Sequence, residues 1–174
     1  MKKILFFILL LLSNELYSQS AEDYYYSGVE KLANDNIGAL SDFTKALKID
    51  PNNADVYFIR GRTKWMLDDN IGAISDFTKT IEINPKYSLA YFERGICKGT
   101  LEDYRGAIAD FTKAIEFDPK NAKAYFYRGF NKLGLATGVN NINQSLNDSA
   151  CLDLSKAGEL GDYGAYDVIK KFCK

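Results

Sequence analysis

The chain has 174 residues, with 22 Lys and Arg against 23 Asp and Glu, and a formal net charge of −1. This balance argues against a nucleic-acid partner, because domains that bind nucleic acids carry a strong basic excess. The sequence contains no histidine, which removes the commonest general base and the commonest metal ligand. We therefore expect no catalytic centre, no metal site and no cofactor.

Residues 1–20 have the layout of a secretory signal peptide. Two lysines precede an apolar run from Ile4 to Leu12, and polar and small residues follow. The run is shorter than the roughly 20 residues that a membrane-spanning helix needs. We expect cleavage after Ser18 or Ser20 and no membrane insertion afterwards, the alternative being an uncleaved anchor. The expected location is the periplasm, the cell surface or the medium.

The rest of the chain repeats itself. The segments SDFTKALKIDPNN, SDFTKTIEINPKY and ADFTKAIEFDPKN begin at Ser41, Ser75 and Ala109, which are 34 residues apart. A fixed period of this length is the signature of small units that stack on one another.

Each unit is expected to hold two helices. In the unit 54–87, the first half contains no proline, and Asp69 is the expected N-cap of a second helix. Apolar residues recur in that second half at helical spacing. Asn84 and Pro85 end it, because proline disfavours a helical conformation in the residue before it.

Small residues recur in the same register, with Gly61, Gly95 and Gly129 in the first helices and Ala39, Ala73 and Ala107 in the second helices. Glycine inside a helix costs about 1 kcal/mol relative to alanine. The glycines therefore indicate a helix that crosses closely, and the alanines are the expected partners at the crossing.

This pattern of Gly, Ala, Phe and Pro resembles the tetratricopeptide repeat. The resemblance implies an all-α fold, a helix-turn-helix repeat solenoid in which antiparallel helix pairs form a right-handed superhelix. The expected domain spans 21–174. It comprises the repeats 21–53, 54–87 and 88–121, a degenerate repeat 122–160 with an inserted loop 136–149, and a capping helix at 164–172.

Arginines and aspartates also recur with the repeat. The arginines stand in the first helices, where the motif has leucine, and each aspartate precedes the recurring phenylalanine of a second helix. We expect a structural ladder between the two sets, and the alternative is a basic track that binds an anionic ligand. The members are Arg60, Arg94, Arg128, Asp42, Asp76 and Asp110, and Asp153 echoes the aspartates in the last unit.

The three cysteines allow only one disulfide, with three possible pairings. Export places them in an oxidising compartment, where disulfides persist. Cys151 and Cys173 fall in the last two expected helices, so we expect them to form a bridge that fixes the cap, the alternative being two free buried thiols. Cys97 is expected to be a buried, unreactive thiol.

The resemblance implies that the first helices line a concave face. Carried over column by column, it makes these residues candidates for partner binding: Tyr25, Phe58, Arg62, Trp65, Phe92, Ile96, Phe126 and Phe130. Gly99 leaves a gap in the column of Trp65. The alternative is that some of these rings only pack between adjacent first helices.

Some tetratricopeptide domains hold the C-terminal carboxylate of a peptide with Lys, Arg and Asn side chains. Here Tyr26, Ile59, Glu93 and Tyr127 occupy a column where such a clamp needs asparagine or a cation. Recognition of an acidic C-terminal tail is therefore not expected.

The expected function is non-catalytic binding of a peptide or partner protein in a concave aromatic groove. The alternative is a structural or assembly component of a cell-envelope complex that docks through the ends or the convex face of the stack. A monomer is favoured, and the oligomeric state stays open. Acidic pairs such as Asp68-Asp69 fall in inter-helix turns, where capping explains them better than acid–base chemistry.

Overall fold

The computed structural model describes residues 19–137 and 144–173 of the chain. All regular structure within these ranges is α-helical, which confirms the all-α repeat class. The expected signal peptide falls almost wholly on residues 1–18, outside the described residues. Within the described part, no helix is both long enough and apolar enough to cross a membrane.

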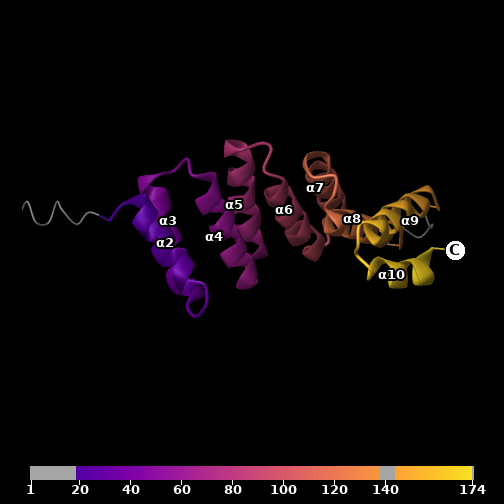
Figure 1. The fold of residues 1–174 in the computed structure, drawn as a ribbon, viewed down its shortest axis with the longest axis horizontal. Helices are drawn as coiled ribbons and strands as arrows, with labels where there is room; N and C mark the ends of the chain where they lie inside the picture. Colours follow the sequence, from indigo (N-terminus) through magenta and orange to yellow (C-terminus); the bar gives the residue numbers. More distant parts are fainter. Residues whose placement is uncertain (1–18, 138–143, 174) are drawn as a thin grey trace, which may run out of the picture. The chain divides into compact units, whose positions relative to one another are not determined.

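The helices fall into two units, which we call the N-terminal pair (within residues 1–52) and the C-terminal array (53–174). Figure 1 labels the helices along the chain. The N-terminal pair comprises α2 (Ala21–Lys31) and α3 (Asn36–Ile49). The C-terminal array comprises α4 (Ala54–Met66), α5 (Asn70–Ile83), α6 (Ser88–Thr100), α7 (Tyr104–Phe117), α8 (Ala122–Thr137), α9 (Gln144–Glu159) and α10 (Ala165–Phe172).

A recurring Asp-x-x-Gly segment starts the second helix of three repeats. The Asp69 side chain accepts a hydrogen bond from the Gly72 backbone N–H at 2.8 Å, which confirms Asp69 as an N-cap. Asp103 caps α7 in the same way, with 2.9 Å to the Gly106 nitrogen. Such caps satisfy backbone donors that have no partner inside the helix. The start of the second helix is therefore specified by the sequence of each of these repeats.

The mid-helix glycines lie against phenylalanine rings. A Cβ added to Gly61 would lie 2.9 Å from the Phe77 ring, and one added to Gly95 would lie 2.9 Å from the Phe111 ring. Both rings are fully buried. The helices cross closely, as expected, but the group next to the glycine is the phenylalanine ring rather than an alanine. Glycine leaves room there for the largest side chain of each repeat core.

The fourth repeat differs from the expected loop 136–149. Helix α8 extends to Thr137 and α9 already begins at Gln144, so only residues 138–143, outside the described part, remain between them. The Asn- and Ser-rich composition suggested a loop through Ser149. Its polar groups are instead used on the helix: the Gln144 amide donates to Asp148 Oδ1 at 2.8 Å, and Ser149 Oγ accepts from Lys132 Nζ at 2.7 Å.

The last helix, α10, packs on α9 and closes the C-terminal array. Ala165 of α10 is fully buried in a cluster with Leu154 and Ala157 of α9. A disulfide joins Cys151 of α9 to Cys173, with a Cα–Cα distance of 5.8 Å. Without such a cap the terminal repeat would expose its apolar face to water.

Candidate binding surface

Arginine–aspartate pairs join the first and second helices of the array. Arg60 donates from Nε and Nη2 to the Asp76 carboxylate at 2.8 and 2.7 Å. Arg94 likewise donates from Nε and Nη2 to the two carboxylate oxygens of Asp110, at 2.9 and 2.7 Å. The two carboxylates are almost completely buried, and such bidentate charge-assisted pairs are strong.

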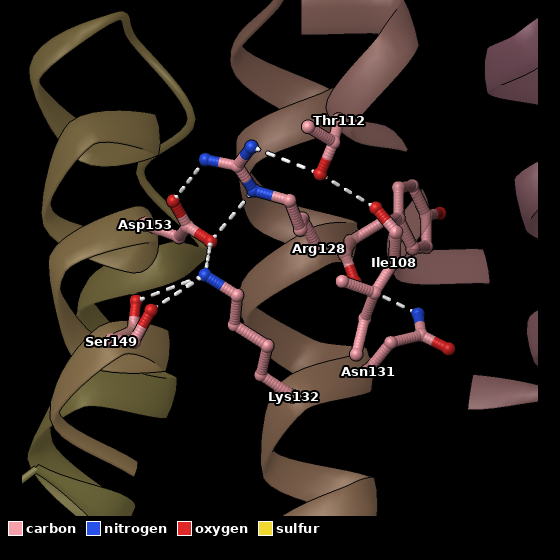
Figure 2. Close-up of polar contacts among 8 residues, drawn as sticks. Ile108, Thr112, Arg128, Asn131, Lys132, Ser149 and Asp153 are labelled. Atoms are coloured by element: carbon pink, nitrogen blue, oxygen red, sulfur yellow. Dashed lines mark hydrogen bonds and ion pairs between the residues drawn. The ribbon is translucent and has the colours of Figure 1, made fainter. Parts of the chain in front are cut away.

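Figure 2 shows the pair of the fourth repeat, in which the partner of Arg128 is Asp153. The arginine donates to the two carboxylate oxygens at 2.8 and 2.5 Å. Lys132 Nζ approaches the same carboxylate at 2.7 Å, and Arg128 Nη1 reaches Thr112 of the preceding repeat at 3.3 Å. The guanidinium groups of Arg60, Arg94 and Arg128 thus pair with carboxylates inside the array, which favours the structural ladder over the basic track.

The N-terminal pair holds its aspartate differently. Ser27 occupies the column of the arginines, and its hydroxyl donates to Asp42 at 2.7 Å. Lys31 and Lys45 complete the site. Burial raises the pKa of the Asp42 carboxyl, but the hydrogen bonds from Lys31, Ser27 and Lys45 outweigh it and hold the pKa at about 2. The expected arginine ladder therefore begins in the array and does not include Asp42.

Three of the expected partner-binding side chains are exposed on first helices of the array. They are Trp65 on α4 (40% exposed), Phe130 on α8 (51%) and Arg62. Their exposure leaves these side chains accessible to a partner. Neighbouring first helices touch one another within the array.

Other expected binding residues belong to the core or pack against it. Phe92 is only 8% exposed and contacts Phe111 and Tyr127, so its assignment to the binding surface is corrected to a core role. Phe58 is half-buried and stacks on Tyr87, with ring centroids 5.0 Å apart. The physical reason is geometric: each of these two rings packs against the second-helix phenylalanine of its own repeat, Phe77 or Phe111, and against a tyrosine at the start of or on the next first helix.

Two further candidates for partner binding are neither fully exposed nor fully buried. Phe126 is half-buried, and its ring stacks on Phe130 with centroids 6.2 Å apart. Tyr25, in the N-terminal pair, is half-buried against Phe43 at 6.2 Å.

A pocket of about 260 Å³ opens between α6 and α8. Three of its walls are aromatic rings, those of Tyr104, Tyr127 and Phe130. The remaining lining residues are Ile96, Gly99, Thr100 and Asn131. The pocket therefore includes Ile96 and Phe130, two of the expected partner-binding residues.

The pocket exists because the third repeat lacks a side chain that the second repeat has. Gly99 stands one period after Trp65, so the indole of one repeat corresponds to empty space in the next. Asn131 of α8 fills part of this space: a Cβ on Gly99 would lie 2.8 Å from Asn131 Oδ1. Glycine at 99 thus keeps the pocket open and the asparagine in place.

Charged groups on α4, α6 and α8 lie about one helical turn before the pocket residues of α6 and α8. Glu93, one helical turn before Ile96, lies 3.7 Å from Arg62. Burial raises the pKa of the Glu93 carboxyl, while the charges of Arg62 and Lys123 oppose that shift. Two cations thus act on one carboxylate.

Sequence reasoning missed Tyr104, Tyr127 and Asn131 as pocket residues. A signal for Tyr104 was present, because it stands where Asn70 stands in the preceding repeat. Asn131 likewise replaces Cys97. Departures from the repeat marked these positions, but only the packing of α6 against α8 places them around one cavity.

The chain was compared with known proteins. A tetratricopeptide repeat family model matches residues 89–121, and no curated protein matches the sequence. Among solved structures, the chain is similar to MamA, with 23% identity, a TM-score of 0.75, and coverage of 87% of this chain and 84% of MamA.

Two other solved structures are also similar. YrrB, described as a tetratricopeptide-repeat protein with an unusual peptide-binding site, has 24% identity and a TM-score of 0.73, with coverage of 90% and 77%. The first such domain of Spaghetti (RPAP3), bound to an HSP90 peptide, has 25% identity and a TM-score of 0.66, with coverage of 68% and 95%. These likenesses and the family match support a protein of the tetratricopeptide-repeat fold.

Proposed function

We propose that this protein is a non-catalytic interaction module that binds a peptide, or an extended segment of a partner protein, on the first-helix face of its C-terminal array. One observation carries the proposal: Trp65 and Phe130 are exposed on first helices, and the pocket lies beside Phe130. Aromatic anchors bury a large area with little loss of rotamer entropy, which is why binding hot spots use them.

Similar proteins support this proposal at the level of the class. The Spaghetti domain is described as bound to a peptide, and YrrB as having a peptide-binding site. The Spaghetti peptide, SRMEEVD, ends in an acidic residue. The present chain has Tyr26, Ile59, Glu93 and Tyr127 in the column expected to serve such a tail, so we propose recognition of an internal peptide segment.

The test is selection of binding peptides from a displayed random 12-residue library with the purified protein. Selected peptides are then measured against Trp65→Ala and Phe130→Ala. The control is Ile71→Ala, which removes an equally apolar side chain that is 74% exposed on a second helix. We expect the first two variants to weaken binding at least about tenfold, and the control to leave it unchanged. Equal affinity for all three variants would contradict binding on the first-helix face.

We also propose that the protein acts outside the cytoplasm. The leader-like residues 1–20 and the disulfide of the cap support export, because structural disulfides persist in oxidising compartments. Cleavage after Ser18 fits better than cleavage after Ser20, because the Ser20 hydroxyl caps α2 by accepting from the Asp23 nitrogen at 3.1 Å. Cell fractionation with N-terminal sequencing of the mature chain tests both points, and an intact N-terminus in the cytoplasm would refute them.

A second candidate function is assembly through the C-terminal end of the array. Tyr163, Tyr166 and Phe172, in and just before α10, are 76%, 44% and 39% exposed. A capping helix that serves only solubility presents a polar outer face, so these rings favour a docking contact. Size-exclusion chromatography with light scattering distinguishes the two candidate functions. A stable oligomer that dissociates when Tyr163→Ser and Tyr166→Ser are introduced supports assembly.

A further inference from the structure

The side-chain amide of Asn131 lines the pocket beside Gly99. This residue is 5% exposed. Its Nδ2 donates to the Tyr127 backbone carbonyl at 2.8 Å, which leaves Oδ1 directed toward the space above Gly99. Figure 2 shows the amide oxygen turned away from that hydrogen bond. Among the residues that the structure describes, no donor binds this oxygen, and Asn131 lines the pocket. A pocket that presents such an acceptor favours a ligand that carries a donor.

Comparison of the repeats indicates which kind of ligand group fits the Gly99 pocket. In the second repeat, the column of Gly99 holds Trp65. The walls of the Gly99 pocket are the rings of Tyr104, Tyr127 and Phe130, and aromatic side chains favour edge-on and offset contacts with other rings. A cavity of about 260 Å³ with aromatic walls and an acceptor in its lining suits an indole or phenol group.

Charge complementarity adds a second feature of the ligand. Arg62 and Lys123 act on Glu93 from the helices on either side, and the side chain of Arg62 is half-exposed. Among the described residues, no carboxylate lies within ion-pair distance of Lys123. Glu93 precedes Ile96 by three residues, which is about 4.5 Å along α6. An extended peptide advances about 3.3 Å per residue, so a residue one or two positions from the anchor would reach this cationic flank.

We propose that the Gly99 pocket is the specificity site of the protein, and that it takes a tryptophan or tyrosine side chain of a partner peptide with an acidic residue one or two positions away. The aromatic ring fills the space that Trp65 fills in the preceding repeat. Its N–H or O–H donates to Asn131 Oδ1, and the acidic residue lies near Arg62 and Lys123. The proposal rests on the proposed peptide-binding function and adds the side chains that are recognised.

The experiment uses the same displayed 12-residue library and the full mature protein. We expect the selected peptides to share a tryptophan or tyrosine with a neighbouring aspartate or glutamate. Synthetic peptides in which the aromatic residue is replaced by alanine should bind about 30-fold more weakly, as for an interface hot spot. Selected peptides without an aromatic residue would overturn the proposal.

Variants then locate the anchor. Gly99→Trp introduces the indole of the second repeat into the pocket and should weaken binding of the wild-type-selected peptides about 30-fold. Asn131→Ala should weaken a tryptophan peptide and leave its phenylalanine analogue unchanged, since only the former donates a hydrogen bond. Equal affinity of Gly99→Trp and the wild type would overturn the pocket assignment.

The Gly99→Trp protein must be folded, which circular dichroism checks, because its Cβ would displace Asn131. If it does not fold, Thr100→Met narrows the pocket with the residue that the second repeat has at that column, Met66, and unchanged binding by that variant contradicts the proposal equally. These measurements distinguish a wrong assignment of the pocket from a wrong proposal of peptide binding. Peptides that lose affinity with Trp65→Ala but not with Gly99→Trp preserve the first-helix face and overturn the pocket, whereas a library that yields no binder contradicts both.

Discussion

Arg94 donates from Nη1 to Thr78 Oγ1 at 3.0 Å, which joins α6 to the second helix of the preceding repeat. The same guanidinium grips Asp110 of its own repeat with Nε and Nη2. One side chain thus links three helices of two repeats. In an array whose stability depends on contacts between neighbours, such an arginine couples the repeats as well as closing one of them.

Replacement of Arg94 by leucine should destabilise the array by about 3 kcal/mol. The change leaves Asp110 buried with only Lys98 beside it, and an incompletely paired buried charge is costly. Urea unfolding measures the effect. Lys113→Ala is the matched control, because Lys113 pairs with Glu116 on the exposed surface and its loss should leave stability nearly unchanged.

The double variant Arg94→Leu/Asp110→Leu separates the value of the pair from the cost of the orphaned charge. It should recover most of the stability lost in Arg94→Leu, since replacing both members of a buried pair by apolar groups is often nearly neutral. Wild-type stability of the single variant would show that the pair is dispensable and would reopen the anion-binding interpretation of the arginines.

Reduction of the disulfide between Cys151 and Cys173 should loosen the cap. The bridge spans 22 residues, for which chain-entropy estimates give about 3 kcal/mol. We expect dithiothreitol to lower the urea midpoint and to speed hydrogen exchange in α10 before the rest of the array. The Cys151→Ser/Cys173→Ser protein should behave like the reduced wild type and be insensitive to the reductant. Equal exchange in oxidised and reduced protein contradicts a fastening role.

Acid should weaken the N-terminal pair through Asp42. Burial acts to raise its pKa, but hydrogen bonds from Lys31, Ser27 and Lys45 lower it from 3.8 to about 2. The folded carboxyl therefore binds its proton less tightly than the unfolded one, so the stabilisation is present above about pH 4 and is lost as the pH falls toward 2. The loss should be about 1 kcal/mol, since the two lysines are partly exposed.

Thermal unfolding monitored between pH 5 and 2 tests this prediction, with hydrogen exchange assigning the change to α2 and α3. The Asp42→Asn protein should be less stable at pH 5 and should vary less over this range than the wild type. If the stability of the wild type and of the variant changed with pH in the same way, the acid sensitivity would belong to other groups.

Cys97 should be inert toward thiol reagents in the folded protein. It is 1% exposed, and burial raises its pKa from 9.0 to about 12, with Glu93 adding to the shift. At pH 8 the folded thiol is protonated, and the thiolate is the reactive form. Iodoacetamide should label Cys97 only after unfolding, as mass spectrometry would show. Because the folded state holds this proton more tightly, stability should fall as the pH rises above about 9; rapid native labelling at pH 8 contradicts the prediction.

Much of the scaffold could be read from the repeating residues. The cap Asp69, the stop at Asn84 and Pro85, and the burial of Cys97 follow from local chemistry that recurs in each copy. The helix boundaries of the fourth repeat were harder to predict, because the composition of its Asn- and Ser-rich stretch favours a loop. Its first helical turns are stabilised by the side-chain hydrogen bonds of Gln144 and Ser149, which composition alone does not reveal.

The candidate site was predictable only in part. Trp65 and Phe130 are exposed as expected, yet Phe92 from the same face is buried by Tyr127 of the next first helix. Whether a ring in such a column faces a partner or a neighbour depends on the side chain opposite, which sequence periodicity cannot specify.

The sequence by itself determined the repeat period, the helix pairs and the close crossing at the glycines, because each follows from local propensity and from copies that must pack alike. It also marked Gly99 as a departure from Trp65. Only the tertiary structure decided what that departure means. Packing of α6 against α8 surrounds the missing side chain with three aromatic rings and turns Asn131 toward it. A cavity is a property of what several helices leave unfilled together, so no single segment of the sequence contains it.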